Sequence, residues 1–179
     1  LSFSFPLIRS FEQKLKFASN IKAILISCFF MMMIFIPWDI LFTKINVWSF
    51  NSEYITGFKI FLLPIEEWMF FIIIPYCCLF IHESLILIRG ISPAREKKYV
   101  NTSVIVAVVF FVIAITNIDK FYTLSSFGLA SVLLFLFSFK KYKWFYNFLR
   151  TYLFSLIALL VVNGVLTGSF IENEIVSYN

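Results

Sequence analysis

The chain alternates between long apolar stretches and short polar or basic segments. Apolar residues dominate positions 21–42, 60–88, 100–118, 121–139 and 151–168. A helix rises about 1.5 Å per residue, so crossing the hydrocarbon core of a bilayer takes about 20 such residues. The pattern therefore predicts five complete transmembrane helices. We interpret the short apolar stretch at residues 1–8 as the remnant of an earlier span.

Composition supports an all-α integral membrane protein. The chain is 61% hydrophobic and 14% charged, with a mean hydropathy of +0.92. Soluble domains are closer to about 45–50% apolar and about 25% charged. The three cysteines lie inside apolar runs and lack the spacing of metal ligands, so we interpret them as packing residues. No metal site and no cofactor motif is predicted.

The basic residues are distributed unevenly between the loops. The segments 9–22, 89–99 and 140–150 each hold four Lys or Arg residues, which makes twelve of the fifteen in the chain. Short loops rich in Lys and Arg stay on the cytoplasmic side of a membrane. We therefore predict a multi-pass protein of the cell inner (plasma) membrane with these three segments in the cytoplasm. The net charge of +5 then reflects topology and not nucleic-acid binding.

Three carboxylates are expected at one depth in the membrane. Glu66 and Glu67 follow Pro64 at the outer start of the second span, and Asp39 lies near the outer end of the first. Ionisable groups inside a membrane cost roughly 2.5–3.5 kcal/mol each on insertion scales and often mark a working site. Neighbouring carboxylates in a medium of low dielectric constant cannot all stay ionised, so we expect at least one neutral acid. Such an acid can protonate an alkene.

Aromatic side chains surround these acids in the sequence. Trp38 and Trp68 flank them, and Phe70 and Phe71 lie on the same helical face as the glutamates. Aromatic rings stabilise cations through their π faces, by about 0.5–2 kcal/mol per contact. Asn163, near the outer end of the fifth span, is placed to point toward the same layer. The alternative interpretation is that these are interfacial carboxylates within an aromatic belt.

Other chemistry finds little support in the sequence. His82 and Glu83 lie about four helical turns from Glu66, and we interpret them as structural or pathway-lining residues. No Gly-rich phosphate loop, Ser/Cys–His–Asp set or Asp-rich diphosphate motif is found. These observations argue against a flavin-dependent Rossmann enzyme, a hydrolase and a typical prenyltransferase.

A weak internal sequence similarity suggests that the chain consists of two related halves. Residues 39–43 and 47–51 resemble residues 164–168 and 176–179, at an offset near 125–128. Both stretches leave the outer end of a span, which fits a duplicated helical unit. We predict a first repeat over residues 1–90 and a second over residues 91–179.

One family shares these features along nearly the whole chain. The relevant residues are Pro37-Trp38-Asp39, Phe42-Thr43, Val47-Trp48-Ser49-Phe50, Gly57, Pro64-Ile65-Glu66-Glu67-Trp68-Met69-Phe70-Phe71 and Asn163-Gly164-Val165-Leu166-Thr167-Gly168. Together they resemble the membrane-type lycopene cyclase domain, which occurs as two subunits in some bacteria and as a fused form in others.

The resemblance implies cyclisation of lycopene to β-carotene by acid catalysis, without net redox change and without an evident cofactor. It implies Glu66 or Glu67 as the acid, and Asp39 as the base or as the charge that keeps the acid protonated. Trp38, Trp68, Phe70 and Phe71 would line the pocket. The implied partners are the carotenoid, the lipid bilayer, and a second cyclase half in the same chain or in an oligomer.

The resemblance also implies a second acidic block, which by the internal offset falls beyond Asn179. We therefore expect a fragment truncated before that motif and inactive alone if both blocks are needed. Three alternatives stay open at this point: a related carotenoid hydratase or ε/γ-cyclase, a proton-coupled transporter, and a structural subunit. An intramembrane Glu pair is compatible with transport, although a transporter is expected to carry acids at several depths.

Overall fold

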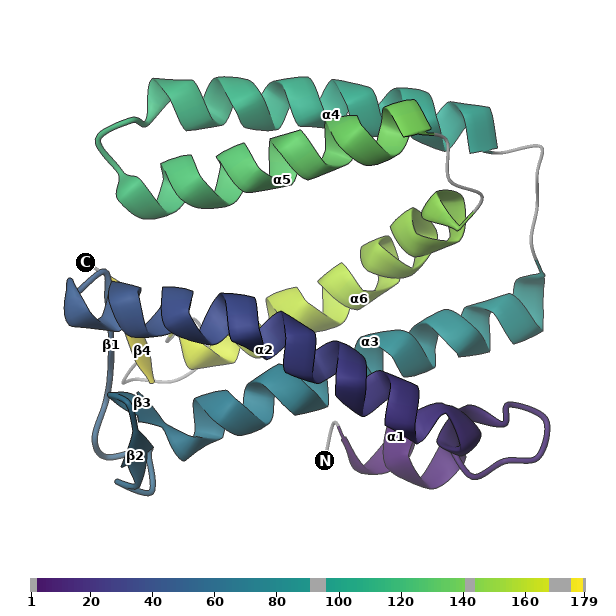
Figure 1. Cartoon of the computed structure of the whole chain (residues 1–179), viewed down its shortest axis with the longest axis horizontal. Helices are drawn as coiled ribbons and strands as arrows, with labels where there is room; N and C mark the ends of the chain where they lie inside the picture. Colours follow the sequence, from purple (N-terminus) through teal and green to yellow (C-terminus); the bar gives the residue numbers. More distant parts are fainter. Residues whose placement is uncertain (1–2, 91–95, 141–143, 168–174, 179) are drawn as a thin grey trace. The chain divides into compact units, whose positions relative to one another are not determined.

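The computed structural model describes residues 3–90, 96–140, 144–167 and 175–178 and is mainly helical (Figure 1). The helices are α1 (Ser4–Arg9), η1, a 3-10 turn (Phe17–Asn20), α2 (Ile21–Lys44), α3 (Ile65–Arg89), α4 (Glu96–Thr116), α5 (Phe121–Lys140) and α6 (Phe145–Leu166). The strands are β1 (Trp48–Phe50), β2 (Lys59–Ile60), β3 (Leu63–Pro64) and β4 (Val176–Tyr178). Five helices, α2 to α6, are long and apolar enough to cross a membrane. The prediction of an all-α membrane protein with five spans is confirmed.

Three helices begin four or more residues from the predicted position, among them α4, which begins at Glu96 and not at position 100. α3 begins at Ile65 and not at position 60, because the preceding residues form the hairpin β2–β3. Pro64 therefore lies in a strand. α6 begins at Phe145, so the predicted basic loop 140–150 is partly helical. Of the four basic residues that had suggested a loop, only Arg150 lies within α6.

The chain forms two compact units, Leu1–Leu87 with Leu153–Asn179, and Ile88–Tyr152. These units reflect packing in space. The predicted repeats concern relatedness in sequence, so their boundary at residues 90/91 stays a prediction.

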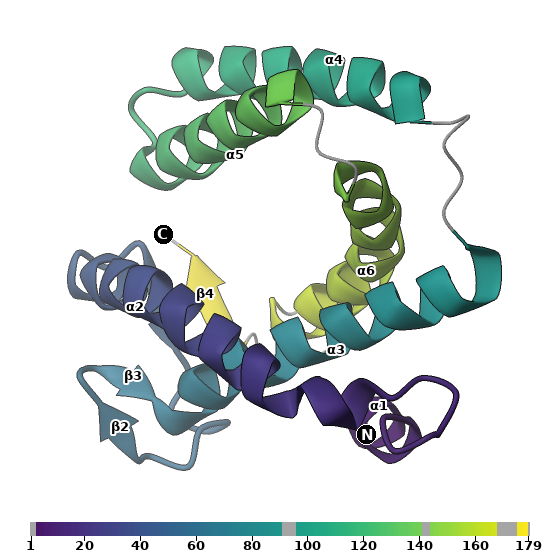
Figure 2. The same ribbon diagram turned by 45° about the vertical axis from the view of Figure 1, so that its right-hand side comes forward.

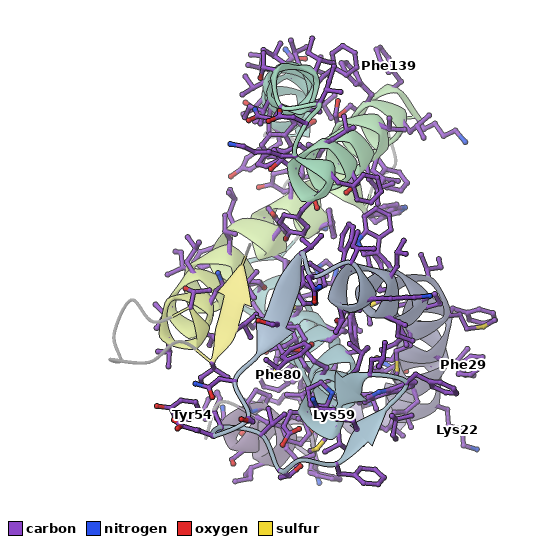
Figure 3. The ribbon with its side chains drawn as sticks, turned by 90° about the vertical axis from the view of Figure 1, so that its left-hand side faces the viewer. Lys22, Phe29, Tyr54, Lys59, Phe80 and Phe139 are labelled. Carbon is purple, nitrogen blue, oxygen red and sulfur yellow. The ribbon has the colours of Figure 1, made fainter. Side chains whose placement is uncertain are left out.

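In the first unit, α2 crosses α3 where an aromatic core joins them (Figures 1 and 2). The core contains Phe17, Ile24, Cys28, Tyr76 and Phe80, the last of which is labelled in Figure 3. Tyr76 and Phe80 each meet the ring of Phe17 edge to face, at centroid distances of 5.2 and 5.6 Å. This packing fixes the first turns of α2 against the second half of α3.

A tight hairpin leads into α3. Its turn residues, Phe61 and Leu62, have φ angles of 50° and 72°, the left-handed geometry that two-residue hairpins usually assign to Asn-Gly. Leu63 and Pro64 are fully buried, and their strand packs against α2. The packing of β3 therefore holds the start of α3 against α2.

The second unit is built on the antiparallel pair α4 and α5. Small residues fill the interface between these helices, with Ala107 and Ala114 almost fully buried. The hydroxyls of Ser103 and Ser138 are 2.6 Å apart, and Ser131 Oγ donates to the Ala107 carbonyl at 2.8 Å. Small and hydroxylated residues allow close approach of helices in lipid. Large apolar residues such as Phe139 point outward instead (Figure 3).

Relieving the turn strain should stabilise the protein. Left-handed geometry costs a bulky residue roughly 1–2 kcal/mol, whereas Asn tolerates it. Leu62 is 53% exposed, so Leu62→Asn removes little packing and is expected to raise the free energy of unfolding by about 1 kcal/mol. Unfolding in mixed micelles measures this change. The control Leu87→Asn changes an exposed leucine in a helix, and equal destabilisation by both variants would contradict the expectation.

Candidate functional site

The first carboxylate of the site lies on α2. The Asp39 side chain is only 8% exposed, and α2 continues past it to Lys44. Thr43 Oγ1 donates a hydrogen bond of 2.9 Å to the Asp39 carbonyl, one turn back along the helix. The acid is therefore held by a continuous helix close to its C-terminal end.

The other two carboxylates occupy the first turn of α3. Glu66 and Glu67 follow directly after β3, where a helix N-terminus favours negative charge. Glu66 Oε1 accepts a 2.8 Å hydrogen bond from the backbone N–H of Thr56. Its second oxygen, Oε2, is buried and has no hydrogen-bond partner among the described residues. One oxygen of Glu66 is thus anchored and the other is available.

The structure brings the three predicted acids together. Glu67 interacts electrostatically with both Asp39 and Glu66. The proximity of the three carboxylates depends on β3, which packs against α2 and is followed directly by α3. A proton-donating acid and a proton-accepting carboxylate can therefore operate side by side.

The four predicted aromatic residues are all half-buried. Trp38 on α2 packs edge to face against Phe42, with ring centroids 5.3 Å apart. Trp68 Nε1 donates to the Ile60 carbonyl at 3.4 Å, which ties α3 to the hairpin. Phe70 and Phe71 stand edge to face at 6.2 Å, one turn beyond the glutamates. Three of these rings thus lie on α3 within two turns of its start, and the fourth lies on α2 beside Asp39 in the sequence.

Asn163 is not brought to the acids by any described interaction. It is exposed on α6, and its carbonyl accepts hydrogen bonds from the backbone and hydroxyl of Thr167. His82 and Glu83 lie on α3 roughly 24 Å beyond Glu67, at about 1.5 Å per residue. In the part of the chain that the structure describes, no group of three or more His, Cys, Asp or Glu residues is placed to hold a metal ion.

Thr56 is a site residue that sequence reasoning missed. Its contribution is a backbone N–H, which any residue except proline can supply, so the side-chain pattern gives no signal. Only the fold of the preceding loop brings this group to Glu66.

Comparison with known proteins gives one match. The family model described as lycopene cyclase matches residues 1–85 and 119–179, which is most of the chain. The first matched segment contains Asp39, Glu66 and Glu67, and the second contains Asn163. No curated protein and no solved structure matches the chain.

Removing the acceptor on Glu66 should loosen the loop that contains Thr56. Glu66→Leu leaves the Thr56 N–H without its acceptor, whereas Glu66→Gln keeps an acceptor oxygen at that position. We expect proteases to cleave residues 51–58 severalfold faster in Glu66→Leu than in Glu66→Gln. Equal cleavage of the two variants and the unmodified chain would show that this hydrogen bond does not hold the loop.

Proposed function

Because the chain belongs to the lycopene cyclase family, we propose that it closes the end groups of lycopene to give β-carotene, by acid-catalysed chemistry within the membrane. The family match indicates carotenoid cyclisation, and the carboxylate cluster suggests how it proceeds. The observation that carries the proposal is the placement of Glu67 where the charges of both Asp39 and Glu66 act on it, at the start of a helix that follows a strand packed against α2.

Glu67 is the proposed acid. It has a carboxylate neighbour on its own helix and another on α2, so repulsion is smallest when Glu67 carries the proton. Asp39 is the proposed negative charge that keeps it there. Catalysis by a positioned acid contributes typically about 10²–10⁴-fold.

Glu66 is the proposed base. The Thr56 N–H and the helix N-terminus both favour its ionised form, and they fix one of its oxygens. The other oxygen, Oε2, is left to accept a proton. Acid and base are then adjacent residues in the first turn of α3.

The reaction balances with these groups alone. Glu67 gives a proton to the terminal double bond of lycopene and leaves a tertiary cation. The neighbouring double bond attacks this cation, so a carbon–carbon bond closes the ring and the positive charge moves into it. Glu66 then removes a ring proton and restores a double bond. One proton enters and one leaves, so the product is an isomer and no redox cofactor is required.

The aromatic residues have a supporting role in this proposal. Trp38, Trp68, Phe70 and Phe71 are half-buried residues on the same two helices as the acids, and ring faces stabilise a cation at about 0.5–2 kcal/mol per contact. They also exclude water, which would otherwise trap the cation as a hydroxylated end group. A hydratase or an ε- or γ-cyclase would differ only in how the cation is lost.

Carboxylate substitutions test the function. We expect the chain, extended at its C-terminus to include a second acidic block and produced in lycopene-accumulating bacteria, to convert lycopene to β-carotene, as measured by chromatography. Glu67→Gln removes the acid and should lower conversion about 10²-fold or more. Glu66→Gln and Asp39→Asn should also reduce it.

Glu53→Gln is the matched control, because Glu53 is an exposed glutamate of the outer loop. It should leave conversion unchanged. Lycopene that stays unconverted by a well-inserted chain would refute the proposed function, and full activity of Glu67→Gln would refute the assigned acid.

We further propose a plasma-membrane location with segments 9–22, 89–99 and 140–150 in the cytoplasm, on the basis of their Lys and Arg content. Single cysteines in a cysteine-free background test this orientation. A membrane-impermeant maleimide added to intact cells should label Ser52→Cys, but should label Gln13→Cys only after lysis. The reverse pattern would invert the topology.

A further inference from the structure

The outer end of α2 is tied to strand β1 by a short relay of hydrogen bonds. After α2 the chain turns back, and the Val47 N–H donates to the Phe42 carbonyl at 2.9 Å. Trp48 Nε1 then donates to Thr43 Oγ1 at 3.1 Å, and that hydroxyl donates to the Asp39 carbonyl at 2.9 Å. The Trp48 ring also packs edge to face on the buried Phe42, at 5.0 Å. Trp48 therefore contacts both residues that follow Asp39 on this face of the helix.

Strand β1 is in turn held by β4, from the C-terminal end of the chain (Figures 1 and 3). The two strands are antiparallel, and the Asn51 N–H extends the ladder by donating to the Ile175 carbonyl at 2.9 Å. Because β1 has three residues and pairs with β4 alone in its sheet, this pairing is the main restraint on the backbone of β1. The position of Trp48 thus depends on a segment far away in sequence.

The register of this pair places two serines opposite each other. Ser49 lies opposite Ser177, Trp48 opposite Tyr178, and Phe50 opposite Val176. These are the same two stretches that resemble each other in sequence. The two stretches that resemble each other in sequence are therefore hydrogen-bonded to one another, with the two serines directly opposite.

We propose that the β1–β4 pair is a clamp through which the C-terminal part of the chain positions Asp39, with Trp48 and Thr43 as positioning residues. This inference rests on the proposed function, because it concerns the geometry of the same carboxylates. The hydrogen-bond relay ends on the backbone at Asp39. Loss of the relay should therefore shift the Asp39 carboxylate relative to Glu67, and should leave the rings proposed to line the carotenoid site in place.

Substitutions in the relay test the positioning role in the full chain. Trp48→Phe keeps a ring against Phe42 and removes the N–H, and Thr43→Val removes the hydroxyl. Each should lower kcat for lycopene about fivefold, the factor that corresponds to one net hydrogen bond, with KM unchanged. The double variant should be no slower than either single variant, because both remove one shared interaction.

Two controls accompany these variants. Thr43→Ser retains the hydroxyl and should restore the rate, and Trp144→Phe makes the same chemical change on an exposed tryptophan of the other unit. Normal kcat in Trp48→Phe, or additive losses in the double variant, would overturn the positioning role while leaving the proposed function intact.

Cross-linking tests the clamp without any need for activity. The hydrogen bond between Asn51 and Ile175 makes Phe50 and Val176 a non-hydrogen-bonded pair, in which side chains are closest. With the native cysteines replaced, Phe50→Cys/Val176→Cys should form a disulfide on mild oxidation. Ser49→Cys/Val176→Cys should not, because neighbouring side chains point to opposite faces. Equal cross-linking of both pairs, or none of either, would refute the register and the clamp.

A labelling experiment separates the two proposals if the chain shows no cyclase activity. In the cysteine-free background, Asp39→Cys should react slowly with a maleimide because the side chain is almost buried. Adding Trp48→Phe should accelerate labelling about fivefold, whereas adding Trp144→Phe should not. Unchanged labelling would refute the positioning role, whatever the outcome of the activity assay.

Discussion

The structure depends on keeping three carboxyl groups together at one end of two membrane spans. Lipid penalises each charge, and the carboxylates repel one another, so none of them would hold its place unaided. The fold offsets these costs locally. Glu66 and Glu67 occupy a helix N-terminus, Thr56 supplies an N–H, and Asp39 is buried on a continuous helix. In the proposed mechanism, the repulsion between these carboxylates leaves one neutral acid beside an ionised base.

The two helices that carry these groups are fixed at both ends. At the end where α2 begins, Phe17 packs with Tyr76 and Phe80, so α2 and α3 cross at a defined point. At the opposite end, β3 packs against α2, and β1 is paired with β4. Between them the helices present large apolar residues outward, as a chain surrounded by lipid requires. The site therefore lies where rigid spans meet short strands.

Much of this arrangement could be predicted from the sequence. Hydropathy located five spans, and an antiparallel pair of spans placed Asp39 at the depth of Glu66 and Glu67. The strands were not predicted, because β1, β2 and β3 have two or three residues each and show no period-two pattern. Phe61 and Leu62 gave no turn signal, since neither residue type favours positive φ. Backbone donors such as the Thr56 N–H and the β1–β4 pairing arise only from tertiary structure.

Infrared spectroscopy of the purified protein tests the central claim most directly, because a protonated carboxyl group absorbs separately from an ionised one. At neutral pH the unmodified chain should show the band of a protonated carboxyl in an apolar setting. Glu67→Gln should abolish this band, and Glu53→Gln should leave it unchanged. If the band persists in Glu67→Gln, or is absent from the unmodified chain, then Glu67 is not the neutral acid and the proposed mechanism is wrong.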